Sequence, residues 1–304
     1  SGEQNRFDLA AGLQAATEIY IKEIFTQLLD AYPQYDHLCI SGGVSLNSVV
    51  MGKMLGWFKD RLADIYAPPT PHDGGLTLGA AQYVWHHILD NPRIEWKDNF
   101  TPYLGFSYDD IKSTLENYDN ISYDSSTDDE VLDLLDNQNI IAVFGGGSES
   151  GRRALGNRSI IADPRSPDMK DLINEKVKHR QWFRPFAPSI LREETKNWFV
   201  LDKESPYMSF VLEFKEEAKD KVPAVVHHNG TARLQTVTKD DNEWYYGFIK
   251  KWHDKSGVPI VLNTSFNDRE PICETAEHAI NCFLRTNIDY LYFYDENILV
   301  RKSK

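Results

Sequence analysis

The pattern of apolar and polar positions changes from helical to strand-like within the first hundred residues. Over 7–29 apolar residues recur every three or four positions, which predicts an amphipathic helix that Pro33 ends. Helices are also predicted at 44–58 and 76–89, and short strands, the first of them buried, at 37–40 and 63–66. The order α-β-α-β-α indicates parallel strands joined by crossover helices, so an α/β domain is expected over 3–92.

A polar connector over 90–100 predicts a domain boundary. Beyond it, strands of mixed direction alternate irregularly with helices, and Ser166, Pro167 and Asp168 are typical of a helix start. The remainder, 100–304, is expected to be an α+β domain with a mixed twisted sheet. The predicted helices are 109–117, 128–135, 167–178, 242–256 and 275–286. The predicted strands are 140–144, 159–162, 207–214, 224–226, 234–237, 258–262, 290–293 and 298–300.

Composition narrows the class of protein. Of the 304 residues 41% are hydrophobic and 26% charged, which excludes collagen, coiled coils and disordered chains. No apolar run approaches the roughly 20 residues that span a bilayer, so no membrane partner is expected. Cys39, Cys273 and Cys282 have no metal-ligand spacing, and we predict that they are buried small apolar residues in a cytoplasmic protein.

Charge is concentrated in one stretch. Ten basic and four acidic residues lie from Arg152 to Arg192, which gives a local charge of +6 in a chain of net charge −13. A local cationic region in an acidic protein favours a small polyanionic ligand over nucleic acid, whose binding requires extensive phosphate neutralisation. The alternative is a solvated basic face.

The basic stretch includes a glycine-rich segment, 145–159, directly after a predicted buried strand. Glycines let backbone N–H groups approach an anion, and Arg153 or Arg158 could hold phosphate oxygens in bidentate fashion. The segment matches neither a Walker A loop nor a dinucleotide fingerprint. The alternative is an ordinary turn.

A second segment places Lys178 and Arg184 six residues apart, separated by aromatic residues and followed by two prolines. This pattern predicts a rigid cationic wall. The alternative is that Trp182, Phe183 and Phe186 belong to the core while the charges extend into solvent.

Two further segments are candidates for ligand contacts. Arg233 follows a glycine turn, whereas His227 and His228 would point to opposite faces of a strand, so a metal pair there is disfavoured. The polar run 263–267 ends a predicted strand, where hydroxyl and amide groups commonly line a ligand. The alternative for this run is a Ser/Asn turn.

In order and spacing these segments resemble the bacterial O-carbamoyltransferase family, which includes nodulation-factor, cephalosporin and tobramycin carbamoyltransferases. The matching segments are 41–47 (SGGVSLN), 73–81 (DGGLTLGAA), 151–159 (GRRALGNRS), 178–189 (KHRQWFRPFAPS), 230–233 (GTAR) and 263–267 (NTSFN). The resemblance implies that 3–92 is the C-terminal part of an actin/hexokinase-like carbamoyl-transfer domain. It implies that 100–304 is a YrdC-like domain that forms carbamoyl-adenylate from carbamoyl phosphate and ATP.

The resemblance also implies roles for individual residues. Those expected to bind carbamoyl phosphate and the phosphates of MgATP are Lys178, Arg184, Arg233 and Ser265, with Arg153, Arg158, Thr264 and Asn267 nearby. Ser41, Gly42, Gly43 and Asn47 would line the nucleotide pocket of the transfer domain. Asp73 would be one ligand of that domain's metal ion, expected to be iron. Without the resemblance, Asp73 is better explained as the N-cap of the following helix.

Two features depart from the family pattern. Asn229 stands where an Asp is expected, and no HxxxH helix precedes Ser41 to complete the metal site; His86 and His87 have the wrong spacing. We therefore expect the C-terminal portion of a longer enzyme that carbamoylates a small hydroxylated acceptor, with a homodimer possible, and a chain that holds no stoichiometric iron alone. The alternatives are a non-catalytic module that binds carbamoyl phosphate or nucleotide, and an RNA-binding YrdC-like domain, which the acidic balance disfavours.

Overall fold

The computed structural model describes residues 2–93 and 101–303, and its chain divides into two compact units. The smaller unit comprises Ser1–Asn91 with Ser209–Val211, and the larger comprises Pro92–Met208 with Leu212–Lys304. Most of the connector expected over 90–100 lies outside the described residues. Within the described residues, no helix combines the length and the apolar character needed to cross a membrane.

The smaller unit has the predicted α-β-α-β-α order. Strands β1 (His37–Cys39) and β2 (Asp64–Tyr66) pair in parallel, with His37 opposite Asp64. The helices are α1 (Gly2–Ala31), α2 (Ser48–Trp57) and α3 (Leu76–Tyr83), and α3 continues as a π-helical segment, Val84–Ile88. The α/β expectation for this part of the chain is confirmed.

Burial in the smaller unit is lower than the sequence predicts. Leu29 is the one buried residue of α1, whereas Leu9 and Leu13 on its apolar face are 74% and 71% exposed. Cys39 in β1 is exposed, so the prediction of a buried strand and a buried thiol is wrong there. A parallel pair of three-residue strands is too small to cover both faces of its own residues.

The helix predicted over 44–58 is interrupted at Asn47. A 3₁₀ turn, Gly43–Leu46, ends at this residue, and the Asn47 side chain then caps α2 by accepting from the Val50 N–H at 3.2 Å. Asparagine competes with the helical backbone for hydrogen bonds, and this favours a cap over a continuous helix.

The larger unit is built on a nine-stranded mixed sheet of order β3-β11-β10-β4-β5-β9-β6-β8-β7. The β10–β4 and β6–β8 pairs are parallel, whereas β4, β5, β9 and β6 run antiparallel to one another in turn. The strands are β3 (Ile121–Ser125), β4 (Ile141–Phe144), β5 (Arg158–Ala162), β6 (Ala187–Leu191), β7 (Phe210–Glu213), β8 (Thr231–Val237), β9 (Ile260–Ser265), β10 (Tyr290–Phe293) and β11 (Ile298–Lys302). The expected mixed sheet is confirmed.

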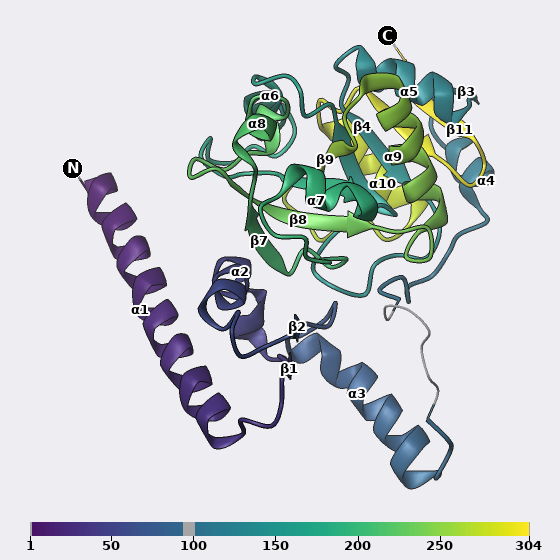
Figure 1. Cartoon of the computed structure of the whole chain (residues 1–304). Coiled ribbons are helices and arrows are strands. Elements are labelled where there is room, and N and C mark those ends of the chain that lie inside the picture. Colours follow the sequence, from purple (N-terminus) through teal and green to yellow (C-terminus); the bar gives the residue numbers. More distant parts are fainter. Residues whose placement is uncertain (1, 94–100, 304) are drawn as a thin grey trace. The chain divides into compact units, whose positions relative to one another are not determined.

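Helices cover this sheet because its central strands are apolar on both faces. Every residue of β4, β5 and β6 is buried. Helices α5 (Asp128–Asp136) and α9 (Glu243–Ser256) pack together over one face, and α10 (Ala276–Arg285) packs on β4 and β10 (Figure 1). The other helices are α4 (Ile111–Leu115), α6 (Met169–Lys176), α7 (Thr195–Trp198) and α8 (Glu216–Lys219).

Several predicted elements of the larger unit need correction. Strands β3 and β6 were not predicted, and 224–226, predicted as a strand, lies largely in a 3₁₀ turn, Pro223–Val225. A proline such as Pro188 has no N–H group for a neighbouring strand and is therefore unfavourable in a central strand. In β6 it is tolerated because β8 pairs with β6 only from Ser189 onward, so Pro188 lies outside the β6–β8 ladder. The cap of α6 is Asp168 rather than Ser166, and it makes no side-chain cap hydrogen bond.

Candidate functional site

Lys178 lies at a point where two of the predicted segments meet. Its ammonium group donates to the backbone carbonyls of Ser265 and Asn267 at 2.5 and 2.6 Å and to Asn267 Oδ1 at 2.8 Å. Ser265 Oγ in turn donates to Asn267 Oδ1 at 2.7 Å. The loop after α6 and the end of β9 are therefore joined through this ammonium group, 87 residues apart in sequence.

Burial sets the charge state of Lys178. The side chain is 5% exposed, and this burial, followed by the positive charge of Arg180, lowers the pKa of the ammonium group to about 7. The group is thus poised between its charged and neutral forms near neutrality, and a nearby anion would favour the charged form.

Arg233 is a half-buried cation whose Nε atom points into the protein. A tight turn in which the Gly230 N–H donates to the His227 carbonyl at 2.9 Å precedes it, with Gly230 at a φ of 78° that favours glycine. Burial, and then the charges of Arg153, Arg180 and Arg184, lower the pKa of Arg233 to about 9. Its Nε atom is buried and has no hydrogen-bond partner within the described residues.

Arg180 was not among the predicted site residues, yet it lies with Arg184 and Arg233. Burial and the Arg184 charge lower the pKa of Arg180 to about 10. Its Nε donates to Asn174 Oδ1 at 2.7 Å, and its guanidinium lies 4.6 Å from the Phe186 ring centroid. The sequence signal was its position two residues after Lys178 in the same loop. We call Arg153, Lys178, Arg180, Arg184 and Arg233 the cationic cluster.

The cationic cluster has no carboxylate ion-pair partner in the described part of the chain. Across residues 2–93 and 101–303, none of its five members forms an ion pair with a carboxylate. His227 adjoins it, and burial together with Arg233 and Lys170 lowers the pKa of this imidazole to about 4. Cations that are partly buried and have no carboxylate in an ion pair are costly, an arrangement that favours an anionic ligand.

A buried carboxylate shapes the loop that carries Arg153. Oε1 of Glu149 accepts from the backbone N–H groups of Leu155, Asn157 and Arg158 at 2.6, 3.0 and 3.4 Å. Burial raises the pKa of this carboxyl group, although the N–H groups of Leu155 and Asn157 and the charge of Arg158 oppose the shift. Glu149 is thus a positioning residue that the sequence did not reveal.

A network of buried polar side chains connects three central strands beside that loop. Ser189 of β6 donates to Gln235 Oε1 of β8 at 2.6 Å, and Asn263 of β9 donates to the same oxygen at 2.9 Å. The amides of Gln235 and Asn263 also donate to the carbonyls of Leu155 and Ala154, at 2.9 and 3.2 Å. The network fixes Arg153, Arg233 and the end of β9 relative to one another.

Arg158 has a different role from the one expected. It is fully buried, and its guanidinium donates to the carbonyls of Gly145, Asn157 and Gly146 at 2.6, 2.9 and 3.3 Å. It also lies 3.6 Å from the Phe144 ring centroid. These contacts use its donors to support the glycine-rich loop, so the structure does not add Arg158 to the cationic cluster. Thr264, the other expected neighbour, is half-buried in β9 opposite Ile160.

In the smaller unit the start of the 41–47 segment contacts Pro71, two residues before the 73–81 segment. Ser41 Oγ and the Gly42 N–H both donate to the Pro71 carbonyl, at 3.0 and 2.6 Å. Asn47 has structural partners: besides capping α2, its amide donates to Gln14 of α1 at 2.9 Å. The nucleotide-binding roles of Gly42, Gly43 and Asn47 stay predictions.

Asp73 is exposed and begins a 3₁₀ turn, Asp73–Gly75. The cap of this turn is His72, whose ring accepts from the Gly74 N–H at 3.0 Å, and α3 has Gly75 at its N-cap. The N-cap explanation of Asp73 is therefore wrong. In the part of the chain that the structure describes, no group of three candidate ligands includes Asp73, so these residues alone do not fit a closed metal site.

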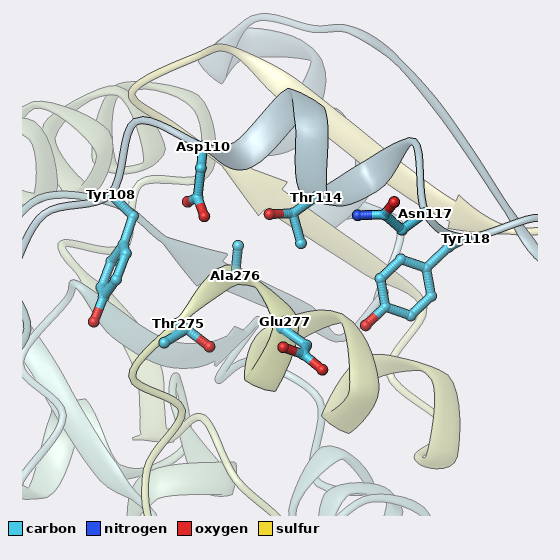
Figure 2. A pocket seen from close by; sticks show the side chains of 8 residues that line it. All are labelled: Tyr108, Asp110, Thr114, Asn117, Tyr118, Thr275, Ala276 and Glu277. Atoms are coloured by element: carbon cyan, nitrogen blue, oxygen red, sulfur yellow. The ribbon is translucent and has the colours of Figure 1, made fainter.

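The larger unit also has a surface pocket of about 440 Å³ next to the start of α10. Figure 2 shows Tyr108 and Tyr118 at its two ends and the carboxylates of Asp110 and Glu277 along it. None of its eight lining residues is basic. Two carboxylates and no basic side chain make this lining unfavourable for an anion.

The comparison with family models identifies the class of protein. The carbamoyltransferase C-terminus model matches residues 132–302, and the carbamoyltransferase N-terminus model matches residues 1–82. The chain therefore belongs to the carbamoyltransferase family, a family of enzymes, and the resemblance seen in the motifs is confirmed.

Individual relatives are similar over most of this chain. Nodulation protein NolO of Bradyrhizobium diazoefficiens is 37% identical over 299 residues, covering 95% of this chain and 54% of that protein. An uncharacterized protein of Synechocystis sp. is 36% identical, covering 99% and 53%. The chain thus spans about half the length of these relatives. Among solved structures, full-length HypF in its phosphate- and nucleotide-bound form has a TM-score of 0.40 at 13% identity, covering 80% of this chain and 36% of that one.

Proposed function

We propose that the larger unit binds carbamoyl phosphate and MgATP and forms carbamoyl-adenylate, which the longer enzyme uses to carbamoylate a hydroxyl group of a small acceptor. The observation that carries this proposal is the cationic cluster, in which partly buried cations lack carboxylate partners. Membership of the carbamoyltransferase family supports the choice of carbamoyl phosphate as the anion.

The proposed reaction balances as carbamoyl phosphate, ATP and water giving carbamoyl-adenylate, pyrophosphate and phosphate. Water first releases phosphate and leaves carbamate, and a carbamate oxygen then attacks the α-phosphorus of ATP and displaces pyrophosphate. Both reactants are anions, so their approach requires fixed positive charge. Arg153, Arg184 and Arg233 would bind phosphate oxygens as planar forks. The ammonium group of Lys178, whose three donors go to Ser265 and Asn267, would add positive charge beside them.

Ser265 and Asn267 have a positioning role in this proposal. They hold the Lys178 ammonium group through two backbone carbonyls and an amide oxygen. An ammonium group fixed in this way loses little freedom when the anion arrives, which is the basis of electrostatic preorganisation.

The transfer step belongs to the proposal only in outline. Asp73 would supply one carboxylate to a divalent metal ion such as iron, whose chemistry would be to polarise a bound oxygen. Because Asp73 belongs to no group of three candidate ligands within the described residues, no step is assigned to it.

Replacing Arg184 tests the proposed anion site. Arg184→Ala is expected to weaken carbamoyl phosphate binding by about 1.5–3 kcal/mol in calorimetry, because a charge-assisted hydrogen bond is lost. Arg192→Ala is the matched control, since Arg192 pairs with Asp202 at 2.5 Å outside the cluster, and its binding should not change. An equal dissociation constant in folded Arg184→Ala protein would remove Arg184 from the site.

A further inference from the structure

Two of the three cysteines lie close to a carboxylate. Glu270 and Cys273 are on the loop that follows β9, and Cys282 is on α10. The Sγ atoms of Cys273 and Cys282 and a carboxylate oxygen of Glu270 all lie within 4.8 Å of one another. Cys273 is 2% exposed and Cys282 is fully buried. Over residues 2–93 and 101–303 this is the one group of three or more candidate metal ligands.

We propose that Glu270, Cys273 and Cys282 bind a thiophilic divalent cation, for which zinc is the best match. Zinc takes cysteine sulfur at about 2.3 Å and carboxylate oxygen at about 2.0–2.2 Å in a tetrahedron, whose sulfur atoms then lie about 3.8 Å apart. Ligand atoms within 4.8 Å of one another reach that spacing through small side-chain movements. Magnesium and calcium prefer all-oxygen sites, so the two thiols select against them.

The local fold already holds the three ligands in place. The Cys273 N–H donates to the Phe266 carbonyl at 2.9 Å and closes the loop, while Cys282 projects from α10. The Glu270 carboxylate accepts from the backbone N–H groups of Asp268 and Arg269, both at 3.2 Å, and pairs with Arg285. Such contacts behind a ligand orient it for the ion.

A second observation comes from Asp268, next to this group. Its Oδ1 atom is buried and has no hydrogen-bond partner among the residues described. A buried carboxylate oxygen without a hydrogen bond is costly, and a nearby positive charge, that of Lys178 or of a bound ion, would offset that cost. A water molecule would complete the tetrahedron, and the Glu270 side chain, 33% exposed, leaves a path from solvent.

The proposed ion would strengthen the anion site without taking part in it. It would join loop 266–273 to α10. This loop contains Asn267 and follows Ser265, the two residues that hold Lys178. The inference does not depend on the proposed function, because metal binding is measured without any substrate.

Cobalt and zinc titrations of the whole chain test the site. After chelation under reducing conditions, we expect one equivalent of Co²⁺ to produce thiolate-to-cobalt charge-transfer absorption, and one equivalent of Zn²⁺ to abolish it. Cys273→Ser and Cys282→Ser should remove the absorption, and Glu270→Gln should weaken zinc binding by about 10- to 100-fold. Cys39→Ser is the control, because Cys39 is exposed in the smaller unit and should leave the signal unchanged.

Two results would overturn the proposal. One is wild-type protein, folded by circular dichroism, that gives no charge-transfer absorption at saturating Co²⁺. The other is isolation of the protein with Cys273 and Cys282 joined as a disulfide and with no zinc retained after reduction and zinc addition. Both are measured on the wild-type chain, so the test does not depend on whether any variant folds.

Discussion

Replacing Arg233 with methionine should separate ligand binding from stability. Burial and three neighbouring guanidinium groups lower the pKa of Arg233 to about 9, which means that its charge costs free energy in the ligand-free chain. Methionine fills similar space without the charge. We therefore expect Arg233→Met to leave the free energy of unfolding unchanged or to raise it by up to about 2 kcal/mol, as for other buried charges replaced by apolar groups.

Binding should change in the opposite direction. Loss of one hydrogen bond from a charged group costs about 1.5–3 kcal/mol. Since about 1.4 kcal/mol corresponds to tenfold, the dissociation constant for carbamoyl phosphate should rise by roughly 10- to 150-fold. A structural arginine would show the reverse pattern, with lower stability and an affinity that changes little in the folded fraction.

Calorimetry with carbamoyl phosphate and urea unfolding without ligand measure the two quantities on the same protein. Arg192→Met is the matched control, because Arg192 is half-buried and paired with Asp202. An Arg233→Met protein that is destabilised by several kcal/mol, or one that binds carbamoyl phosphate as tightly as wild type, would refute the reasoning.

Two further predictions concern buried titratable groups. The unfolded chain keeps the Lys178 proton up to a pH of about 10, whereas the folded chain releases it near 7, so unfolding takes up a proton between these pH values. The free energy of unfolding should therefore rise with pH in this range, by at most about 1.4 kcal/mol per pH unit. Urea unfolding at pH 7, 8 and 9 should show a smaller rise for Lys178→Met than for wild type, and an equal rise would contradict the assignment. Glu149→Gln should lower the free energy of unfolding by about 1–3 kcal/mol, since Oε1, the acceptor of three backbone N–H groups, loses its charge, and a buried amide group whose donors need partners replaces Oε2. Exposed Glu217→Gln is the control, and an unchanged urea midpoint for Glu149→Gln would show that the carboxylate does not shape the loop.

Local patterns predicted most elements of the larger unit because each buries a clear apolar face. Helix α5 is an example: Thr127 and Glu130 form a capping box, and Val131, Leu132 and Leu135 are buried. Strand β6 could not be predicted in this way, because it contains Pro188, which is unfavourable in a central strand. The proline is tolerated only because the pairing of β6 with β8 starts at Ser189. Where β8 begins to pair is a property of the whole sheet, and no local pattern contains it.

In the candidate site, too, some residues could be selected from local sequence patterns and others only from the fold. Lys178, Ser265 and Asn267 were selected from their segments and do meet in the structure. Arg158 belongs to the same basic stretch but is turned toward backbone carbonyls, and only the fold distinguishes it from Arg153. Glu149 and Cys273 were missed because their meaning depends on partners brought together by the loops after β4 and β9.

Exchange of labelled pyrophosphate into ATP tests the central claim most directly. The chain is incubated with MgATP, labelled pyrophosphate and carbamoyl phosphate, since reversal of carbamoyl-adenylate formation transfers the label into ATP. The account predicts exchange that requires carbamoyl phosphate, persists in Arg192→Ala and falls sharply in Arg184→Ala and Arg233→Met. No exchange by a folded chain that binds both ligands, or exchange of equal rate without carbamoyl phosphate, would contradict it.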